Sequence, residues 1–219
     1  MRFYMLALFI AISADGYTQV NHSIKPSDAM ENLPPLGQYS KEWHMPQYLA
    51  CNTAKNATYM SLEERKVIYI LNLMRKNPKL FARSVVAKYP GLAYQSWLVN
   101  IDEYKSLMDT LLKMQPVNLL KPDKKCYTSS QCHAASTGPK GYVGHARIDT
   151  HCDSLLYYNG ECIDYGYDRA LDIIMHLMID EGVSSLGHRL ICISSYKGLG
   201  VSIQPHKQYG HMAVLDFTY

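Results

Sequence analysis

The sequence predicts an α+β fold, with helices in the first part of the chain and an antiparallel hairpin at the end. Two observations carry this prediction. Apolar residues recur at helical spacing in several segments between residues 61 and 181, and after residue 190 the pattern changes to short β-rich runs. A length of 219 residues, 47% of them hydrophobic, suits one domain with a full core, or at most two.

The N-terminus has the pattern of an export signal. Arg2 precedes an apolar run, residues 3–12, that is too short to span a bilayer, and small residues suited to cleavage follow it. We therefore expect residues 1–16 to be a signal peptide. The mature protein is then secreted or held in the cell envelope, and no other segment reaches transmembrane length.

The domain itself is expected at residues 60–219, after a polar, proline-interrupted arm at residues 17–59 that we expect to be mostly irregular. The first helix starts at Ser61, because Ser61 and Glu64 form a capping-box pattern ahead of an apolar helical repeat. Asn77-Pro78 breaks this helix and starts a second one.

Three more helices are expected farther along the chain. Residues 104–114 are amphipathic, and residues 121–137 have a proline suited to a first turn and end at Gly-Pro. The third begins at Asp168, its expected N-cap, and stops at Gly182.

Strands follow these helices. Residues 190–193, 198–204 and 211–217 are rich in β-formers. The last two face each other across a loop at residues 205–210, which is typical of a hairpin.

The net charge and the number of cysteines indicate which partners and which cross-links to expect. A net charge of +3, with the basic residues scattered, is too small to argue for a membrane-surface partner, and we expect no nucleic-acid partner. An even number of cysteines in an exported chain favours disulfides, and no closely spaced pair suggests a metal site. The candidate disulfide cysteines are Cys51, Cys126, Cys132, Cys152, Cys162 and Cys192. Their pairing is open, although at least one bridge is expected near the motifs described next.

Chemically capable residues concentrate in four nearby stretches at expected loops or element ends. They are His145, Glu161, the neighbours Asp180 and Glu181, and His188. The two acids lie at the C-terminal end of an expected helix, where a carboxylate costs up to about 1 kcal/mol, and such local violations tend to mark functional sites. Two imidazoles with one or two carboxylates can hold Zn²⁺ or another divalent cation, or can pair and brace a cleft without metal.

Other polar residues have simpler interpretations. Cys162 is a weaker candidate as a thiol nucleophile than as a disulfide partner, and Ser184-Ser185 suits a flexible loop better than a hydrolase site. His176 is expected at the core or its boundary, and His206 and His211 at the surface.

At these residues the chain resembles the CAP superfamily, which comprises cysteine-rich secretory proteins, antigen 5, pathogenesis-related 1 proteins and their bacterial secreted relatives. The resemblance runs from about residue 61 to the end, and it is strongest toward the bacterial branch. Its motifs, in chain order, are YILNLMRKNPKLFA, CHAAS with GYVGHARI, GECIDYGYDRALDIIMHLMIDEG, and GHRLICI with the closing strands. Each motif is short, but their order and spacing make the match specific.

The resemblance implies a three-layer α-β-α sandwich around a central, mostly antiparallel sheet, with a cleft lined by two histidines and two acids. His145 and His188 match the two histidines, and Glu161 matches the Glu of the family's Gly-Glu-Asn motif. Cys162 stands where that motif has Asn.

The second acid is either Asp180 or Glu181. In the family it follows a helix aromatic by three residues, and the interval from Leu177 to Asp180 reproduces this spacing, which favours Asp180.

Three functions remain in competition. The leading one is a secreted CAP-domain protein whose cleft binds a divalent cation and a small-molecule, lipid, sterol or peptide ligand, without established catalysis. The alternative is a metal-dependent, protease-like hydrolase that uses His145 and His188 as ligands and an acid as general base. The third treats the four groups as a hydrogen-bonded brace.

Overall fold

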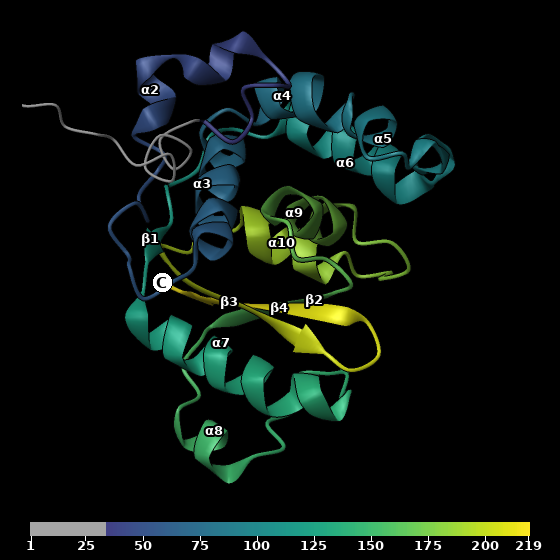
Figure 1. Cartoon of the computed structure of the whole chain (residues 1–219). Coiled ribbons are helices and arrows are strands. Elements are labelled where there is room, and N and C mark those ends of the chain that lie inside the picture. Colours follow the sequence, from purple (N-terminus) through teal and green to yellow (C-terminus); the bar gives the residue numbers. More distant parts are fainter. Residues whose placement is uncertain (1–33) are drawn as a thin grey trace, which may run out of the picture. The chain divides into compact units, whose positions relative to one another are not determined.

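A four-stranded mixed sheet organises residues 34–219, the part of the chain that this computed structural model describes (Figure 1). In spatial order the strands are β1 (Lys121–Pro122), β3 (Gly198–His206), β4 (Gly210–Thr218) and β2 (Gly160–Tyr165). β1 pairs with β3 in parallel, and the other pairings are antiparallel. β3 and β4 form the predicted hairpin, and β2 is an edge strand. The expected signal peptide, residues 1–16, lies outside the described residues.

Helices cover both faces of this sheet (Figure 1). α7 (Lys124–Thr137) packs on β3 and β4, and the opposite face carries α3 (Leu62–Lys76), α9 (Ala170–Ile179) and α10 (Gly187–Ile193). The other helices are α2 (Pro46–Leu49), α4 (Pro78–Phe81), α5 (Tyr89–Leu92), α6 (Asp102–Lys113) and α8 (Thr150–Ser154). Single turns lie at η1 (Lys41–His44), η2 (Ala82–Val86), η3 (Ser96–Asn100) and η4 (Gly138–Lys140). Among the described residues no helix combines the length and apolar character needed to cross a membrane.

The first helices begin and end where the sequence predicts. Ser61 Oγ accepts the backbone N–H of Glu64 and the Glu64 carboxylate accepts that of Ser61, so the capping box forms and α3 starts at Leu62. Asn77 is the C-cap of α3 and the N-cap of α4, which confirms the break at Asn77-Pro78.

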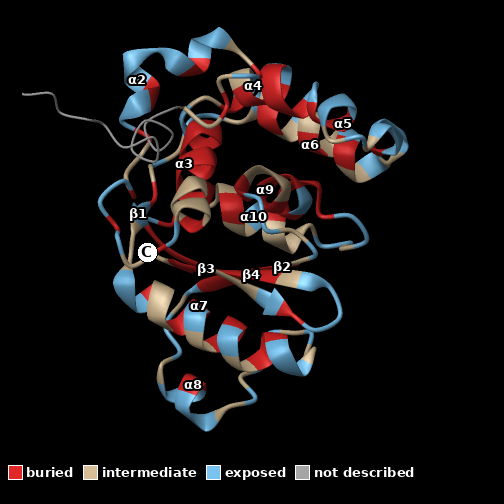
Figure 2. Ribbon diagram, in the orientation of Figure 1, coloured by how far each residue is buried: buried red, intermediate tan, exposed pale blue. Residues whose placement is uncertain are grey.

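The main hydrophobic core lies on the α3, α9 and α10 side of the sheet (Figure 2). The described part of the expected N-terminal arm, residues 34–59, has only short helical turns, yet it contributes to this core. Leu36, Trp43 and Cys51 are fully buried in it. This segment therefore packs with the domain.

The face beneath α7 is largely polar. Its apolar cluster is small: Ala134, Ile163, Met212 and Val214. The other buried side chains facing it from α7 include Ser129, Ser130, His133 and Thr137, and the sheet contributes Glu161, Ser202 and Asp216. A buried polar layer of this kind is stable only if its members bond one another.

One predicted element type is wrong, and one strand was not predicted. Residues 190–193 belong to α10 rather than to a strand, because the Asp180 carboxylate accepts the N–H groups of His188 and Arg189 and so starts a helix there. Residues 160–165 form β2, although no strand was expected there, since buried acids interrupt its apolar pattern. Short apolar runs do not distinguish strand from helix.

The ends of α9 also differ from the prediction. Asp168 does not cap it; the helix starts at Ala170, whose N–H bonds the Glu63 carboxylate. At the other end Asp180, with φ 59°, supplies the left-handed residue that was expected at Gly182. The acid that looked misplaced at a helix end is therefore the cap itself.

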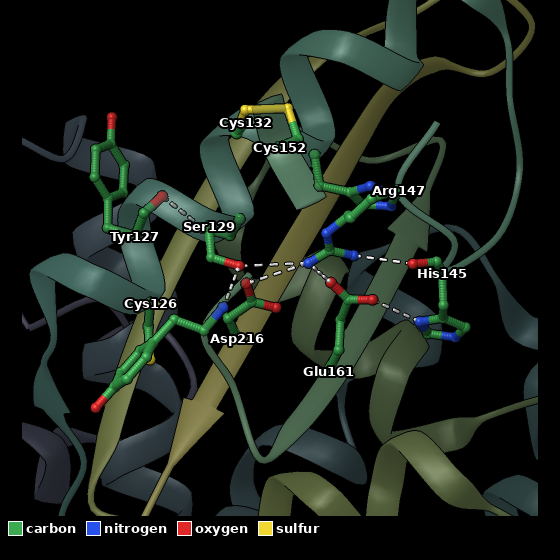
Figure 3. Close-up of polar contacts among 12 residues, drawn as sticks. Cys126, Tyr127, Ser129, Cys132, His145, Arg147, Cys152, Glu161 and Asp216 are labelled. Carbon is green, nitrogen blue, oxygen red and sulfur yellow. Dashed lines mark hydrogen bonds and ion pairs between the residues drawn. A yellow bond between two sulfur atoms is a disulfide. The ribbon is translucent and has the colours of Figure 1, made fainter. Parts of the chain in front are cut away.

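The disulfide prediction is confirmed for one pair. Cys132 and Cys152 form a bridge between α7 and α8, and it closes the intervening loop that carries His145 (Figure 3). The other four, Cys51, Cys126, Cys162 and Cys192, are buried free thiols, which corrects the expectation that they are bonded.

Candidate functional site

Two loops from opposite faces of the sheet meet at the edge strand β2. One follows α7 and carries His145, and the other follows α9 and leads into α10 with His188. The two imidazole ring centroids lie 6.4 Å apart. Together they line a cavity of about 260 Å³, called here the main cleft. Its walls are Val143, Gly144, His145, Ile163, Tyr165, His176, Leu177, Asp180, Glu181, Val183 and His188.

His145 is oriented by Glu161 of β2. Its Nδ1 lies 2.8 Å from Glu161 Oε1. Because a carboxylate only accepts, Nδ1 donates, and Nε2 is the atom left for a ligand. The His145 side chain is 55% exposed, whereas the Glu161 side chain is 2% exposed. A buried carboxylate therefore orients a solvent-accessible imidazole.

His188 is oriented in the same way by Asp180. Its Nδ1 donates to Asp180 Oδ1 at 2.7 Å, and its backbone N–H bonds Oδ2 at 3.0 Å. The left-handed backbone at Asp180 aims the carboxylate across the turn. Glu181 is exposed and lines the cleft, so Asp180 is the acid that holds the histidine and Glu181 contributes a second carboxylate at the wall.

A third histidine–carboxylate pair lines the main cleft, and sequence reasoning missed it. His176 Nδ1 bonds Asp164, whose side chain is fully buried on β2. This hydrogen bond raises the pKa of His176 above its ordinary value. Of the two expected places, core or boundary, His176 lies at the boundary, since its side chain is 47% exposed and its partner Asp164 is fully buried. The available signal was its place one helical turn before Asp180.

Glu161 belongs to a buried charge network beneath α7 (Figure 3). Arg147 forms an ion pair with Glu161 at 2.6 Å and lies 3.6 Å from Asp216, the cross-strand neighbour of Glu161. Burial alone would raise the pKa of Glu161, but hydrogen bonding to His145 and the Arg147 guanidinium lower it to about 2. Burial, and then the Glu161 carboxylate, raise the pKa of Asp216 to about 9. At neutral pH one carboxyl group is charged and the other is protonated.

This arrangement predicts the pH dependence of an Asp216→Asn variant. Unfolded Asp titrates near pH 4, so between about pH 4 and 9 the folded protein holds a proton that the unfolded chain has lost. The free energy of unfolding of the wild type therefore falls as pH rises through this window. Asparagine has no such proton. Urea denaturation should therefore show that the free energy of unfolding of the variant, relative to that of the wild type, is higher at pH 8.5 than at pH 5. A relative stability that is constant with pH would contradict the raised pKa.

No family model, curated protein or solved structure that was compared matches this chain.

The four groups do not form a closed metal site. Among residues 34–219 no set of three or more His, Cys, Asp or Glu side chains is arranged to hold an ion. The acids are engaged with the Nδ1 atoms, which leaves two imidazole Nε2 atoms as direct ligands. Neither Nε2 has a hydrogen-bond partner within the described part of the chain. Carboxylate-supported histidines of this kind are common metal ligands, with water completing the coordination shell.

The other sequence candidates lie outside this chemistry. Cys162 is buried beside Cys192, and burial raises the pKa of its thiol, which makes it a poor nucleophile. Ser184 and Ser185 are exposed. His206 is buried, not at the surface as expected, because Nε2 donates to the Tyr142 carbonyl oxygen.

Proposed function

We propose that this chain is an exported protein of the CAP superfamily whose main cleft binds Zn²⁺ or a similar divalent cation through His145 and His188. The observation that carries the proposal is the pair of neighbouring imidazoles that line one cleft, each held at Nδ1 by a buried carboxylate. With tetrahedral Zn–N bonds of about 2 Å, two imidazoles that share one ion place their ring centres roughly 5–5.5 Å apart. The separation of 6.4 Å exceeds this by about 1 Å, so the two rings must move closer together to share an ion.

The arrangement of helices supports the same assignment. Helices on both faces of a mixed sheet, with an antiparallel hairpin at its centre, are compatible with a three-layer α-β-α sandwich. The resemblance implies a cleft built from His145, Glu161, Asp180 and His188, and the contacts among these four residues support the proposal. The rest of the cleft would then take an unidentified small-molecule, lipid, sterol or peptide ligand beside the cation.

Calorimetric titration with Zn²⁺ tests the cation site. We expect binding by the wild type and at least tenfold weaker binding by His145→Ala and His188→Ala, since each removes one of two protein ligands. His151→Ala is the matched control, because His151 is exposed on α8, outside the cleft wall. Equal affinity in all four proteins would leave the histidines with a bracing role only.

A metal-dependent hydrolase is the second candidate. An imidazole with Nδ1 held by a carboxylate and Nε2 free is also the arrangement of a general base. A screen of peptide and ester substrates in the presence of Zn²⁺ decides between the two. Turnover that is lost in His188→Ala, with folding retained, favours the enzyme; absence of turnover on every substrate favours binding alone.

A further inference from the structure

A second, smaller cavity opens beside the main cleft. It measures about 60 Å³ and shares His176 and Glu181 with the main cleft. Three aromatic side chains line it: Tyr89, Trp97 and Tyr167. We call it the aromatic cavity. This volume is that of about two liquid waters, at roughly 30 Å³ each, so a larger head group would enter only in part and extend into the adjoining main cleft.

Two of the rings are fixed by hydrogen bonds at their hydroxyl groups. The Tyr89 hydroxyl donates to Asp172 at 2.8 Å, and Gln95 Nε2 donates to the Tyr167 hydroxyl at 3.3 Å. Tyr167 also packs against the His176 imidazole, with ring centroids 5.3 Å apart. The third ring, Trp97, is 48% exposed. A small ligand therefore meets a largely preformed aromatic wall.

The charge at this wall is negative. Glu181 is exposed, and within residues 34–219 it has neither an ion pair nor a hydrogen bond. The neighbouring charges are compensated: His176 is bonded to Asp164, and Asp172 lies 3.6 Å from Arg169. The carboxylate of Glu181 is thus the net charge that a ligand in the aromatic cavity would meet.

We propose that the aromatic cavity binds a small alkylammonium group. The negative faces of tyrosine and tryptophan rings attract cations, and a carboxylate beside them adds Coulomb attraction. An anion would be repelled by both features. A neutral apolar group would fit the space without using Glu181. Because Glu181 and His176 are shared with the main cleft, the rest of an ammonium ligand can extend toward His188.

Choline is a suitable probe, and 3,3-dimethylbutan-1-ol is its neutral counterpart of nearly the same shape. Binding to the full chain is measured by calorimetry in buffer with a metal chelator, so the result does not depend on the proposed cation site. We expect choline to bind at least tenfold more tightly than the neutral alcohol, and to shift the emission of the half-exposed Trp97. Trp43, the other tryptophan, is fully buried.

The choline affinities of three variants test whether choline binds in the aromatic cavity. Glu181→Gln should weaken choline binding about tenfold, and Trp97→Leu should weaken it at least as much. Tyr94→Leu is the matched control: Tyr94 is 96% exposed near Trp97 but does not line the cavity. Its affinity should match wild type. Far-ultraviolet circular dichroism checks that each variant is folded, and Tyr167→Leu replaces Trp97→Leu if that variant is not.

Equal affinities for choline and the neutral alcohol would overturn the proposal in favour of a purely apolar pocket. Undetectable choline binding, or full affinity in Glu181→Gln, would also overturn it. His145→Ala separates the two sites: it should lose Zn²⁺ affinity and keep choline affinity.

Discussion

Replacing Arg147 with methionine should lower the free energy of unfolding by about 3–5 kcal/mol at pH 7, as measured by urea denaturation. The Arg147 side chain is 1% exposed, and it neutralises Glu161, which is equally inaccessible. Without the guanidinium, a buried carboxylate keeps only the hydrogen bond from His145 and the interaction with the protonated Asp216 carboxyl group. The deficit should shrink as pH falls, because Glu161 in the variant can then take up a proton.

Arg83→Met is the matched control for this experiment. Arg83 is exposed, so its replacement should change the unfolding free energy by less than about 0.5 kcal/mol. A comparably small effect at Arg147 would mean that Glu161 does not depend on the ion pair. In that case the network in Figure 3 would not be what fixes the acid beneath His145.

Gly200→Ala should also be severe, with an expected loss of about 3 kcal/mol or more. A methyl group on Gly200 of β3 would lie 1.9 Å from the Tyr127 backbone nitrogen and 2.2 Å from the Cys126 carbonyl carbon. Backbone atoms cannot rotate aside as a flexible side chain can, so α7 must move off the sheet. Thermal and urea denaturation measure the loss.

Gly91→Ala provides the contrast. Gly91 lies in α5, and a methyl group there has no neighbour within 4 Å. Alanine should leave stability unchanged or raise it by up to about 1 kcal/mol, because it restricts the unfolded chain and favours the helix. If both glycine variants behaved alike, the close approach of α7 to β3 would not limit stability.

The elements that sequence reasoning located are those with a clear local signal. α3 has a capping box and an apolar repeat, and the β3–β4 hairpin has two β-rich runs around a short loop. By contrast, β2 was missed because Glu161 and Asp164 interrupt its apolar pattern. Charged residues are expected at the surface unless they are paired, and the pairing partners of buried ones cannot be identified from the sequence.

The same reason explains which parts of the site could be predicted. His145, Glu161, Asp180 and His188 lie in short motifs beside glycines, and the structure brings them together. Arg147 and Asp216 carry no local signal, because their role depends on a cross-strand pairing that only the folded sheet creates. His176 was assigned to the core or its boundary because it lies near the apolar stripe of its helix, and that position gives no sign of its bond to Asp164.

Asp180 has a consequence for how the cleft is assembled. One residue terminates α9, accepts the first amide groups of α10 and holds the His188 ring. The backbone turn and the imidazole therefore order as one cooperative unit. Fraying at the end of α9 would release the ring as well, so the histidine cannot move independently of the helix junction. The rigidity of the His188 side of the cleft therefore depends on the stability of the junction between α9 and α10.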